Sequence, residues 1–209
     1  MIAIIGGTGR LGLGLARRLS RTQTPVLIGS RDENRARTAA AEAGLGAGQG
    51  RTNVDAARSA DLVILAVPNE GHEPTLRALA PHLGGKVLLD TTVHYDRATR
   101  SVVLPGGISA AERAQQLVPQ ARVVSGFHTV SAAMLADLER PARGDVLFCG
   151  DDAGAKEPVA AMVRSIDMRP VDAGALATSR LLEQLAGLLI DLNRRYKKKD
   201  LTIQIAGLE

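Results

Sequence analysis

A glycine-rich run near the N-terminus has the spacing that most clearly indicates chemistry. Gly7, Gly9 and Gly12 directly follow the apolar run Ile2–Ile5 and stand where a helix would begin. At this spacing the first glycine allows a tight turn, the second lets the backbone approach a pyrophosphate, and the third permits close packing of helix on strand. The helix N-terminus also presents free N–H groups to phosphate oxygens. The run therefore predicts a dinucleotide site rather than a purely structural turn.

The glycines leave a second register open. Gly6, together with the later glycines, gives the spacing of short-chain dehydrogenases. Such an enzyme usually also needs a Tyr followed four residues later by Lys, and neither Tyr95 nor Tyr196 has a Lys there. The short-chain interpretation is therefore disfavoured.

The residues after the second apolar run, Val26–Ile28, distinguish between the two dinucleotides. An NAD site usually places an acidic residue there to bind the ribose 2′-hydroxyl. This chain has Ser30, Arg31 and Arg35 instead. A hydroxyl and two guanidinium groups suit a 2′-phosphate, which predicts NADP. Alternatively, Ser30 caps a helix and the arginines are solvated, with Asp32 as a rival acidic contact.

Two further segments fall near the same crevice. The apolar run Leu62–Val67 stops at Pro68 and Asn69, a place that lies beside the nicotinamide ribose in sheets of this kind. Residues 123–134 run from a predicted strand into a loop that contains His128. His128 is a candidate proton donor or substrate hydrogen-bonder, although a lone histidine is also often structural.

The elements that must position these residues alternate between β-rich and helical runs. Such alternation is typical of an α/β protein with a Rossmann-type doubly wound parallel sheet. The expected strands are Ile2–Ile5, Val26–Ile28, Leu62–Val67, Val87–Leu89 and Arg122–Ser125, with Gly50–Val54 as a short addition. The expected helices are Leu11–Arg21, Asp32–Ala43, Pro74–Leu83 and Ser109–Leu117, the last of which opens with a capping box.

The regular alternation of expected strands and helices changes after about residue 130. The later expected elements are Ala132–Leu138, Ala155–Ile166 and Thr178–Lys198 as helices, and Val146–Cys149, Arg169–Asp172 and Leu201–Ile205 as extended segments. We predict an NADP-binding Rossmann domain over residues 1–130. Residues 131–209 would form a small C-terminal α/β lobe that completes the substrate cleft and makes oligomer contacts.

The composition excludes several classes of function. The chain has 209 residues, 45% of them apolar and 23% charged, and its four aromatic rings are two Tyr and two Phe. So few rings provide no stacking platform for single-stranded nucleic acid. The net charge of +4 comes from 26 basic residues, mostly Arg spread along the chain, which favours a phosphorylated small molecule over nucleic acid.

The single cysteine limits the location and the metal chemistry. Cys149 can form neither a disulfide framework nor a cysteine metal cluster, and the Asp151–Asp152 pair is expected to cap a helix rather than bind a metal. No metal site is therefore expected. The N-terminus lacks the features of a signal peptide, and no segment is apolar enough to span a bilayer. We expect a cytoplasmic protein without a membrane partner.

Taken together, several segments resemble the NADPH-dependent coenzyme F420 reductases, also called reduced-F420:NADP oxidoreductases. The resemblance extends nearly from end to end. It rests on Gly6–Gly14, Gly29–Arg31, Val124–Ala133 with His128-Thr129, Cys149–Asp152, Arg169–Gly174 and Ser179–Leu181. The resemblance implies a Rossmann domain with a small C-terminal lobe, usually as a homodimer. It also implies hydride transfer between nicotinamide C4 and C5 of a deazaflavin, with NADP and coenzyme F420 as small-molecule partners.

By position, the resemblance also implies roles for individual residues. The pyrophosphate would be held by Thr8, Gly9, Arg10 and Leu11, and the 2′-phosphate by Ser30, Arg31 and Arg35. The nicotinamide side would be lined by Pro68, Asn69, Val93 and Ala132. The second ring system would be approached by His128, Thr129, Val130, Ser131, Thr178, Ser179, Gly207 and Leu208, with His128, Thr129 and Thr178 nearest the chemistry.

Two other functions stay open. Related modules pass electrons from NADPH to an ordinary flavin, so the second substrate could be FMN or FAD. A non-catalytic NADP-sensing protein would bind the dinucleotide tightly without turnover. The paired segments around His128 and Thr178 favour an enzyme, because a sensor would not need them.

Overall fold

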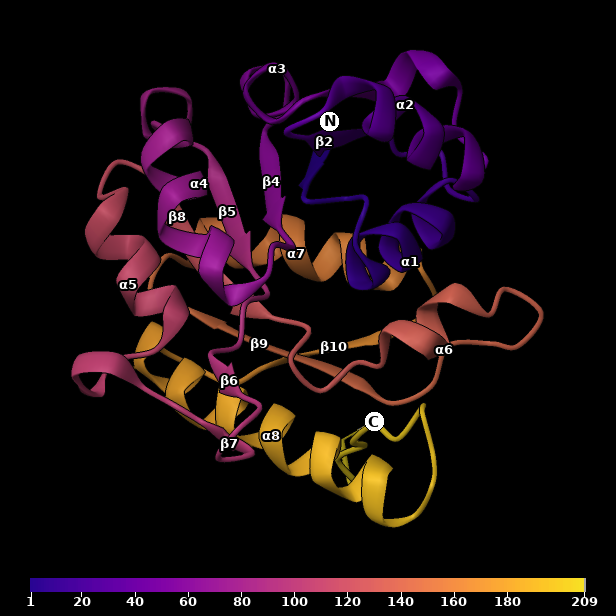
Figure 1. Ribbon diagram of the computed structural model, residues 1–209. Helices are drawn as coiled ribbons and strands as arrows, with labels where there is room; N and C mark the ends of the chain where they lie inside the picture. The colour runs from indigo at the N-terminus through magenta and orange to yellow at the C-terminus, as the bar shows by residue number, and fades with distance from the viewer. Residues whose placement is uncertain (209) are drawn as a thin grey trace.

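One sheet of eight strands runs through the molecule, and helices cover both of its faces (Figure 1). The computed structural model describes residues 1–208. In spatial order the strands are β10 (Arg169–Asp172), β9 (Asp145–Gly150), β8 (Arg122–Gly126), β5 (Val87–Asp90), β4 (Leu62–Leu65), β1 (Ile2–Ile5), β2 (Val26–Ser30) and β3 (Gly50–Thr52). The six from β8 to β3 are parallel, whereas β9 pairs antiparallel with β8. The predicted Rossmann-type sheet is confirmed.

Within residues 1–208, eight α-helices connect or flank these strands. They are α1 (Arg10–Leu19), α2 (Glu33–Glu42), α3 (Asn53–Ser59), α4 (His72–Leu79), α5 (Ala110–Leu117), α6 (Ala132–Ala136), α7 (Ala153–Ser165) and α8 (Ser179–Arg195). Short 3₁₀ turns occupy Ala47–Gln49, Asn69–Gly71, Ala80–His82, Pro105–Gly107 and Leu176–Thr178. Within the described residues, none of the helices has the length and apolar character needed to cross a membrane.

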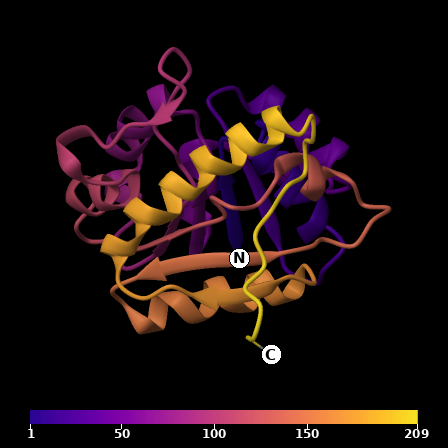
Figure 2. The ribbon, with the colours of Figure 1, turned by 90° about the horizontal axis from the view of Figure 1, so that it is seen from below.

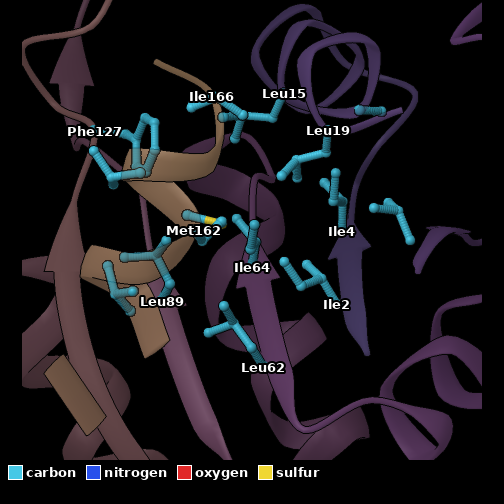
Figure 3. Packing of buried hydrophobic residues seen from close by; sticks show 14 of the residues in the cluster. Ile2, Ile4, Leu15, Leu19, Leu62, Ile64, Leu89, Phe127, Met162 and Ile166 are labelled. Carbon is cyan, nitrogen blue, oxygen red and sulfur yellow. The ribbon is translucent and has the colours of Figure 1, made fainter. Parts of the chain in front are cut away.

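The central strands are apolar throughout because both of their faces are covered. Every residue of β1, β4 and β5 is buried. Alternate side chains enter two separate cores: Ile4 and Ile64 pack with α1 and α7 on one face (Figure 3), whereas Ile5 packs with α3, α4 and α5 on the other. The sheet is thus a rigid central layer whose strand ends can hold a site.

Short polar side chains fix where several helices begin. The Ser109–Glu112 capping box is present, which confirms that prediction. Asp152 caps α7 as predicted, while Asp151 accepts a hydrogen bond from the backbone N–H of Leu176 instead. Asp32 caps α2 by accepting from the N–H groups of residues 34 and 35. These caps fix the helix starts next to the strand ends.

Three local features differ from the sequence-based expectations. Residues 201–205 are not a strand, and the segment crosses beside β9 and β10 (Figure 2). There the Asp145 backbone N–H donates to the Ile203 carbonyl, and the Asp145 carboxylate accepts from the Ile205 N–H. The Asp145 side chain therefore makes one of the hydrogen bonds that a neighbouring strand would make if residues 201–205 were part of the sheet. The helix α3 was not predicted, because its seven residues are too short for a clear period. The hairpin β6 (Tyr95–Asp96) and β7 (Ser101–Val102) was also missed.

The expected boundary at residue 130 falls inside a continuous sheet. Strands β9 and β10 come from residues after 130 and extend the sheet built by the earlier ones. The long α8 then lies below them in the view of Figure 1. The division into two domains stays a prediction.

Candidate functional site

The loop between β1 and α1 needs its glycines for different reasons. Gly6 has a φ of 73°, and a Cβ there would lie 2.7 Å from the carbonyl oxygen of Ala66. The tight turn predicted at Gly7 is therefore made by Gly6, one residue earlier. Gly7 is needed for packing, because a Cβ there would lie 2.9 Å from a methyl group of Ile28. At Gly12 a Cβ would lie 2.7 Å from the Cα of Gly7, so the helix packs closely on the loop.

The N-terminus of α1 has no side-chain cap among the described residues. Gly9 is the N-cap, no side chain caps the helix, and its first turn has no acidic residue. Thr8 is half-buried beside it. The exposed Arg10 has no carboxylate within ion-pair distance in residues 1–208. Free N–H groups beside an unpaired cation suit an anion, so this loop fits the pyrophosphate of a dinucleotide.

The end of β2 carries a second group of cations. The Ser30 hydroxyl accepts from the backbone N–H of Asp32, and Asp32, not Ser30, caps α2. The alternative that Ser30 is a helix cap is therefore wrong, and the Asp32 carboxylate is already engaged. Arg31 and Arg35 are exposed, and no ion pair joins them to a carboxylate of the described chain, whereas Arg37 pairs with Glu33 at 2.7 Å. The arrangement fits a 2′-phosphate.

A pocket of about 340 Å³ lies beyond the carboxyl ends of β5 and β8. In an open α/β sheet, ligands bind at this edge. Eight of the residues expected at the site line it together: Arg10, Leu11, Val93, His128, Thr129, Val130, Ser131 and Ala132. The pocket therefore adjoins the pyrophosphate loop, where α1 begins, and continues along the segment that follows β8.

One wall of this pocket was not foreseen. It comes from α8 and the chain after it, through Ala186, Leu189, Ile190, Asn193, Lys199 and Leu201. The rest of the lining consists of Thr91, Phe127 and Ala133. The four α8 residues recur at i, i+3, i+4 and i+7, which is one face of a helix. That period is readable in the sequence, and it was the signal that could have found this wall.

Of the residues expected at the nicotinamide or at the second ring, six lie outside this pocket. Asn69, which follows Pro68, lines a neighbouring cavity of about 650 Å³ with His94 and Tyr95. Ser179 is buried at the start of α8, where its hydroxyl lies 2.6 Å from that of Ser109; half-buried Thr178 precedes it. Gly207 and Leu208 are exposed, and Arg169 binds the Leu208 carbonyl.

His128 is a buried residue with one ring atom left free. Its Nε2 lies 2.7 Å from the Ser125 hydroxyl, whereas its Nδ1 is buried without a partner. Burial lowers the pKa of His128 to about 4, so the ring is neutral at neutral pH. When the Ser125 hydroxyl donates to Nε2, the proton sits on the buried Nδ1.

A charged clamp below the pocket holds the C-terminal segment. Arg169 forms two hydrogen bonds with the buried Asp145, at 2.7 and 2.8 Å, and donates to the Ile205 carbonyl at 2.7 Å. The Thr129 hydroxyl points toward the Asp145 carbonyl at 3.4 Å, and the Thr129 carbonyl accepts from Thr202 at 2.9 Å. Thr129 is thus 1% exposed and engaged with the chain through both groups.

A second buried pair supports the end of β5. His72 Nε2 lies 2.6 Å from the Asp90 carboxylate, and both side chains are 1% exposed. Burial raises the pKa of Asp90, but the charge of His72 and the hydrogen bonds from His72 and Thr92 together hold it below its usual value. Asp90 directly precedes pocket residue Thr91. Cys149 is buried and free, and burial raises its pKa to about 12, so it is no nucleophile.

A glycine loop at a helix N-terminus, a cationic group at the end of β2 and a pocket at the carboxyl edge of the sheet define a Rossmann-type dinucleotide-binding protein. Within residues 1–208, His, Cys, Asp and Glu side chains form no cluster that could hold a metal ion. Comparison with known proteins defines the family.

The family model described as "NADP oxidoreductase coenzyme F420-dependent" matches residues 1–94. The F420-dependent NADP reductase of Methanocaldococcus jannaschii is 40% identical over 222 residues, which cover 100% of this chain and 99% of that protein. The chain belongs to the family of F420-dependent NADP reductases.

Two other comparisons extend this result. The crystal structure of a candidate F420-dependent NADP reductase from Arthrobacter sp. FB24 superimposes with a TM-score of 0.81 at 29% identity and covers 98% of each chain. The rat metalloreductase STEAP3 is 34% identical over 179 residues, which are 86% of this chain and 35% of that protein. The chain therefore also resembles part of a larger reductase.

Proposed function

We propose that this protein is an NADP-dependent oxidoreductase that transfers a hydride between NADP(H) and the deazaflavin coenzyme F420. The observation that carries the proposal is the pocket of about 340 Å³ that adjoins the pyrophosphate loop at Arg10 and is closed by α8. NADPH, when bound, supplies the hydride from nicotinamide C4, C5 of the deazaflavin receives it with both electrons, and solvent supplies the balancing proton. Such a transfer needs two rings held close together and no covalent nucleophile.

The residues of the chain divide this task between them. The N-terminus of α1, from Thr8 to Leu11, binds the pyrophosphate, and Ser30 with Arg31 and Arg35 binds the 2′-phosphate. Val93 and Ala132 line the nicotinamide side of the pocket, with Pro68 and Asn69 at its edge. The chain thereby orients the dinucleotide from both of its phosphate groups.

The second ring is bound by the segment after β8 and by α8. His128, Val130 and Ser131 lie beside it, and Leu189 and Ile190 supply an apolar wall. We assign this wall the role first expected of Thr178 and Ser179, because those two lie at the far end of α8, about 16 Å away at 1.5 Å per residue.

We further propose a homodimer that forms through the outer face of α8. Leu181 and Leu188 on that face are 62% and 51% exposed, and together with Leu185 and Leu192 they form a continuous apolar stripe. Such a stripe on a surface helix favours a second copy of the chain. In this proposal residues 131–209 form the smaller C-terminal domain that carries both the cleft wall and the contact, and the dimer acts in the cytoplasm, where NADPH is available.

Reduction of an ordinary flavin, FMN or FAD, is the second candidate. Stopped-flow absorbance would separate the two. The purified protein is mixed with NADPH and F420, and in parallel with NADPH and FMN or FAD. We expect loss of the deazaflavin absorbance only with F420. Turnover with flavin alone would transfer the assignment to a flavin reductase, and tight NADPH binding without any turnover would indicate a sensor.

A further inference from the structure

Two short segments of the chain frame the nicotinamide side of the proposed site. The first segment, residues 68–71, follows β4, and the second, residues 91–93, follows β5. These strands are parallel neighbours in which Leu65 pairs with Asp90, so both segments leave the sheet at the same edge (Figure 1). Thr91 and Val93 of the second segment line the pocket of about 340 Å³. The position of one segment against the other therefore shapes that side of the pocket.

Thr91 attaches the second segment to the end of β4. Its backbone N–H donates to the Leu65 carbonyl at 3.2 Å, and its hydroxyl donates to the same carbonyl at 2.9 Å. The side chain is buried. A carbonyl oxygen has two lone pairs, so Thr91 supplies a donor for each of them.

Asp90 joins the two segments through its two carboxylate oxygens. Its Oδ1 accepts from the Thr92 backbone N–H at 2.9 Å, and its Oδ2 lies 2.6 Å from Nε2 of His72, the first residue of α4, which directly follows the first segment. Although burial raises the pKa of Asp90, the charge of His72 and the hydrogen bonds from His72 and Thr92 keep that pKa below its usual value. The carboxylate is therefore ionised at neutral pH and accepts from Nε2. One side chain thus bridges the turn after β5 to the turn after β4.

The chemistry of this bridge is unusual for a buried layer. The Asp90 and His72 side chains are each 1% exposed, and all other residues of β4 and β5 are Val, Leu or Ile. Nδ1 of His72 is also buried without a partner among the described residues. A buried ion pair adds little net stability compared with well-packed apolar side chains. Stability alone therefore does not account for the pair, whereas a directional bridge fixes the geometry of two turns.

We infer that Asp90 and His72 are positioning residues for hydride transfer. Their bridge fixes residues 91–93 against residues 68–71, and through Val93 it holds the nicotinamide at a set distance from the second ring. Neither side chain lines the pocket or the neighbouring cavity, so both act through the residues that they hold. The inference rests on the proposed function. Hydride transfer is sensitive to such a bridge because a misplacement of about 1 Å can slow a reaction about a hundredfold.

Three variants separate the bridge from the general stability of the fold. H72L/D90N removes the bridge without leaving an unpaired buried charge, and the amide oxygen at residue 90 can still accept from the Thr92 N–H. H72Q keeps an N–H donor close to the position of Nε2. L79A is the control, because Leu79 lies on the same helix and is 0% exposed but belongs to the apolar core and not to the bridge.

The assay is single-turnover stopped-flow absorbance of F420 reduction, with NADPH and with NADPH deuterated at C4, at several temperatures. We expect H72L/D90N to slow hydride transfer about ten- to hundredfold and to leave Kd for NADPH unchanged, because the phosphate groups are bound elsewhere. The deuterium isotope effect should depend more steeply on temperature, since the two rings are held together less closely. H72Q should keep the rate of the unchanged protein. L79A should unfold at a lower temperature but keep both the rate and the isotope effect.

An unchanged rate and isotope effect in H72L/D90N would overturn the inference, as would an equal loss of rate in L79A or in H72Q. If H72L/D90N does not fold, T91V takes its place, because it removes only the hydroxyl hydrogen bond to Leu65. A normal rate and isotope effect in T91V would likewise overturn the inference. Failure of the unchanged protein to reduce F420 would instead refute the proposed function itself.

Discussion

Selectivity for NADPH should depend on Arg31 and Arg35, which are exposed at the end of β2 and the start of α2. A charge-assisted hydrogen bond contributes about 1.5–3 kcal/mol when well formed, whereas exposed ion pairs contribute about 0.2–1 kcal/mol. Two exposed guanidinium groups that bind one phosphate should each contribute a free energy between these limits, about 1–1.5 kcal/mol. Arg31→Ala should therefore raise KM for NADPH about five- to tenfold. KM for NADH should not change, because NADH lacks the 2′-phosphate.

The assay measures KM for NADPH and for NADH at saturating F420 in three proteins: the unchanged chain, R31A and R37A. Arg37 is the matched control, since it lies on the same helix and carries the same charge, but it is already paired with Glu33 at 2.7 Å. We expect R37A to retain the selectivity of the unchanged protein. Equal increases of KM for NADPH and for NADH in R31A would refute the 2′-phosphate assignment. They would mean that Arg31 acts only through the stability of the fold or through the general electrostatic field of the protein.

Three further predictions concern packing and charge. Gly12→Ala should destabilise the fold by about 1–3 kcal/mol and weaken NADPH binding, because its Cβ would lie 2.7 Å from the Cα of Gly7; thermal unfolding with and without NADPH measures both. Glu183 has a pKa raised to about 8, chiefly by burial, against a usual 4.5, so the folded state binds the extra proton and loses stability as the pH rises between these values. Glu183→Gln should flatten that loss in urea unfolding between pH 5 and 8, and an unchanged slope would contradict it. Arg169→Ala should free residues 203–208 from the Asp145 clamp, which faster hydrogen exchange of the Ile205 N–H would report.

The nucleotide half of the site was predictable because its signals are local. A buried strand, a glycine loop and a helix start follow each other within Ile2–Gly12. The turn was misplaced by one residue because Gly6 and Gly7 are adjacent. Only the structure shows which of them has the positive φ. The cationic group at Arg31 was predictable for the same reason of local spacing.

The wall from α8 was harder to predict because it depends on how a distant helix is rotated. Leu181, Leu185, Leu188 and Leu192 form the more obvious apolar stripe in the sequence, yet Leu181 and Leu188 are exposed, and α8 buries the neighbouring face that includes Leu182 and Glu183. The pocket face has its own helical period, but its residues are less apolar than the four leucines and include the buried Glu183. The resemblance alone therefore led to Thr178 and Ser179 instead of Ala186 and Leu189.

The turn after β8 connects the scarcity of aromatic rings to the geometry of the site. Phe127 lines the pocket, is 2% exposed, and has a φ of 69°, a strained conformation for a large side chain. Its ring packs into the core that α1 and α7 share (Figure 3), so the strain is held by burial. His128 follows in the same turn and lines the pocket. Leu189 and Ile190 give the pocket apolar surface without an aromatic ring, so Phe127 is the one phenyl ring among its lining residues.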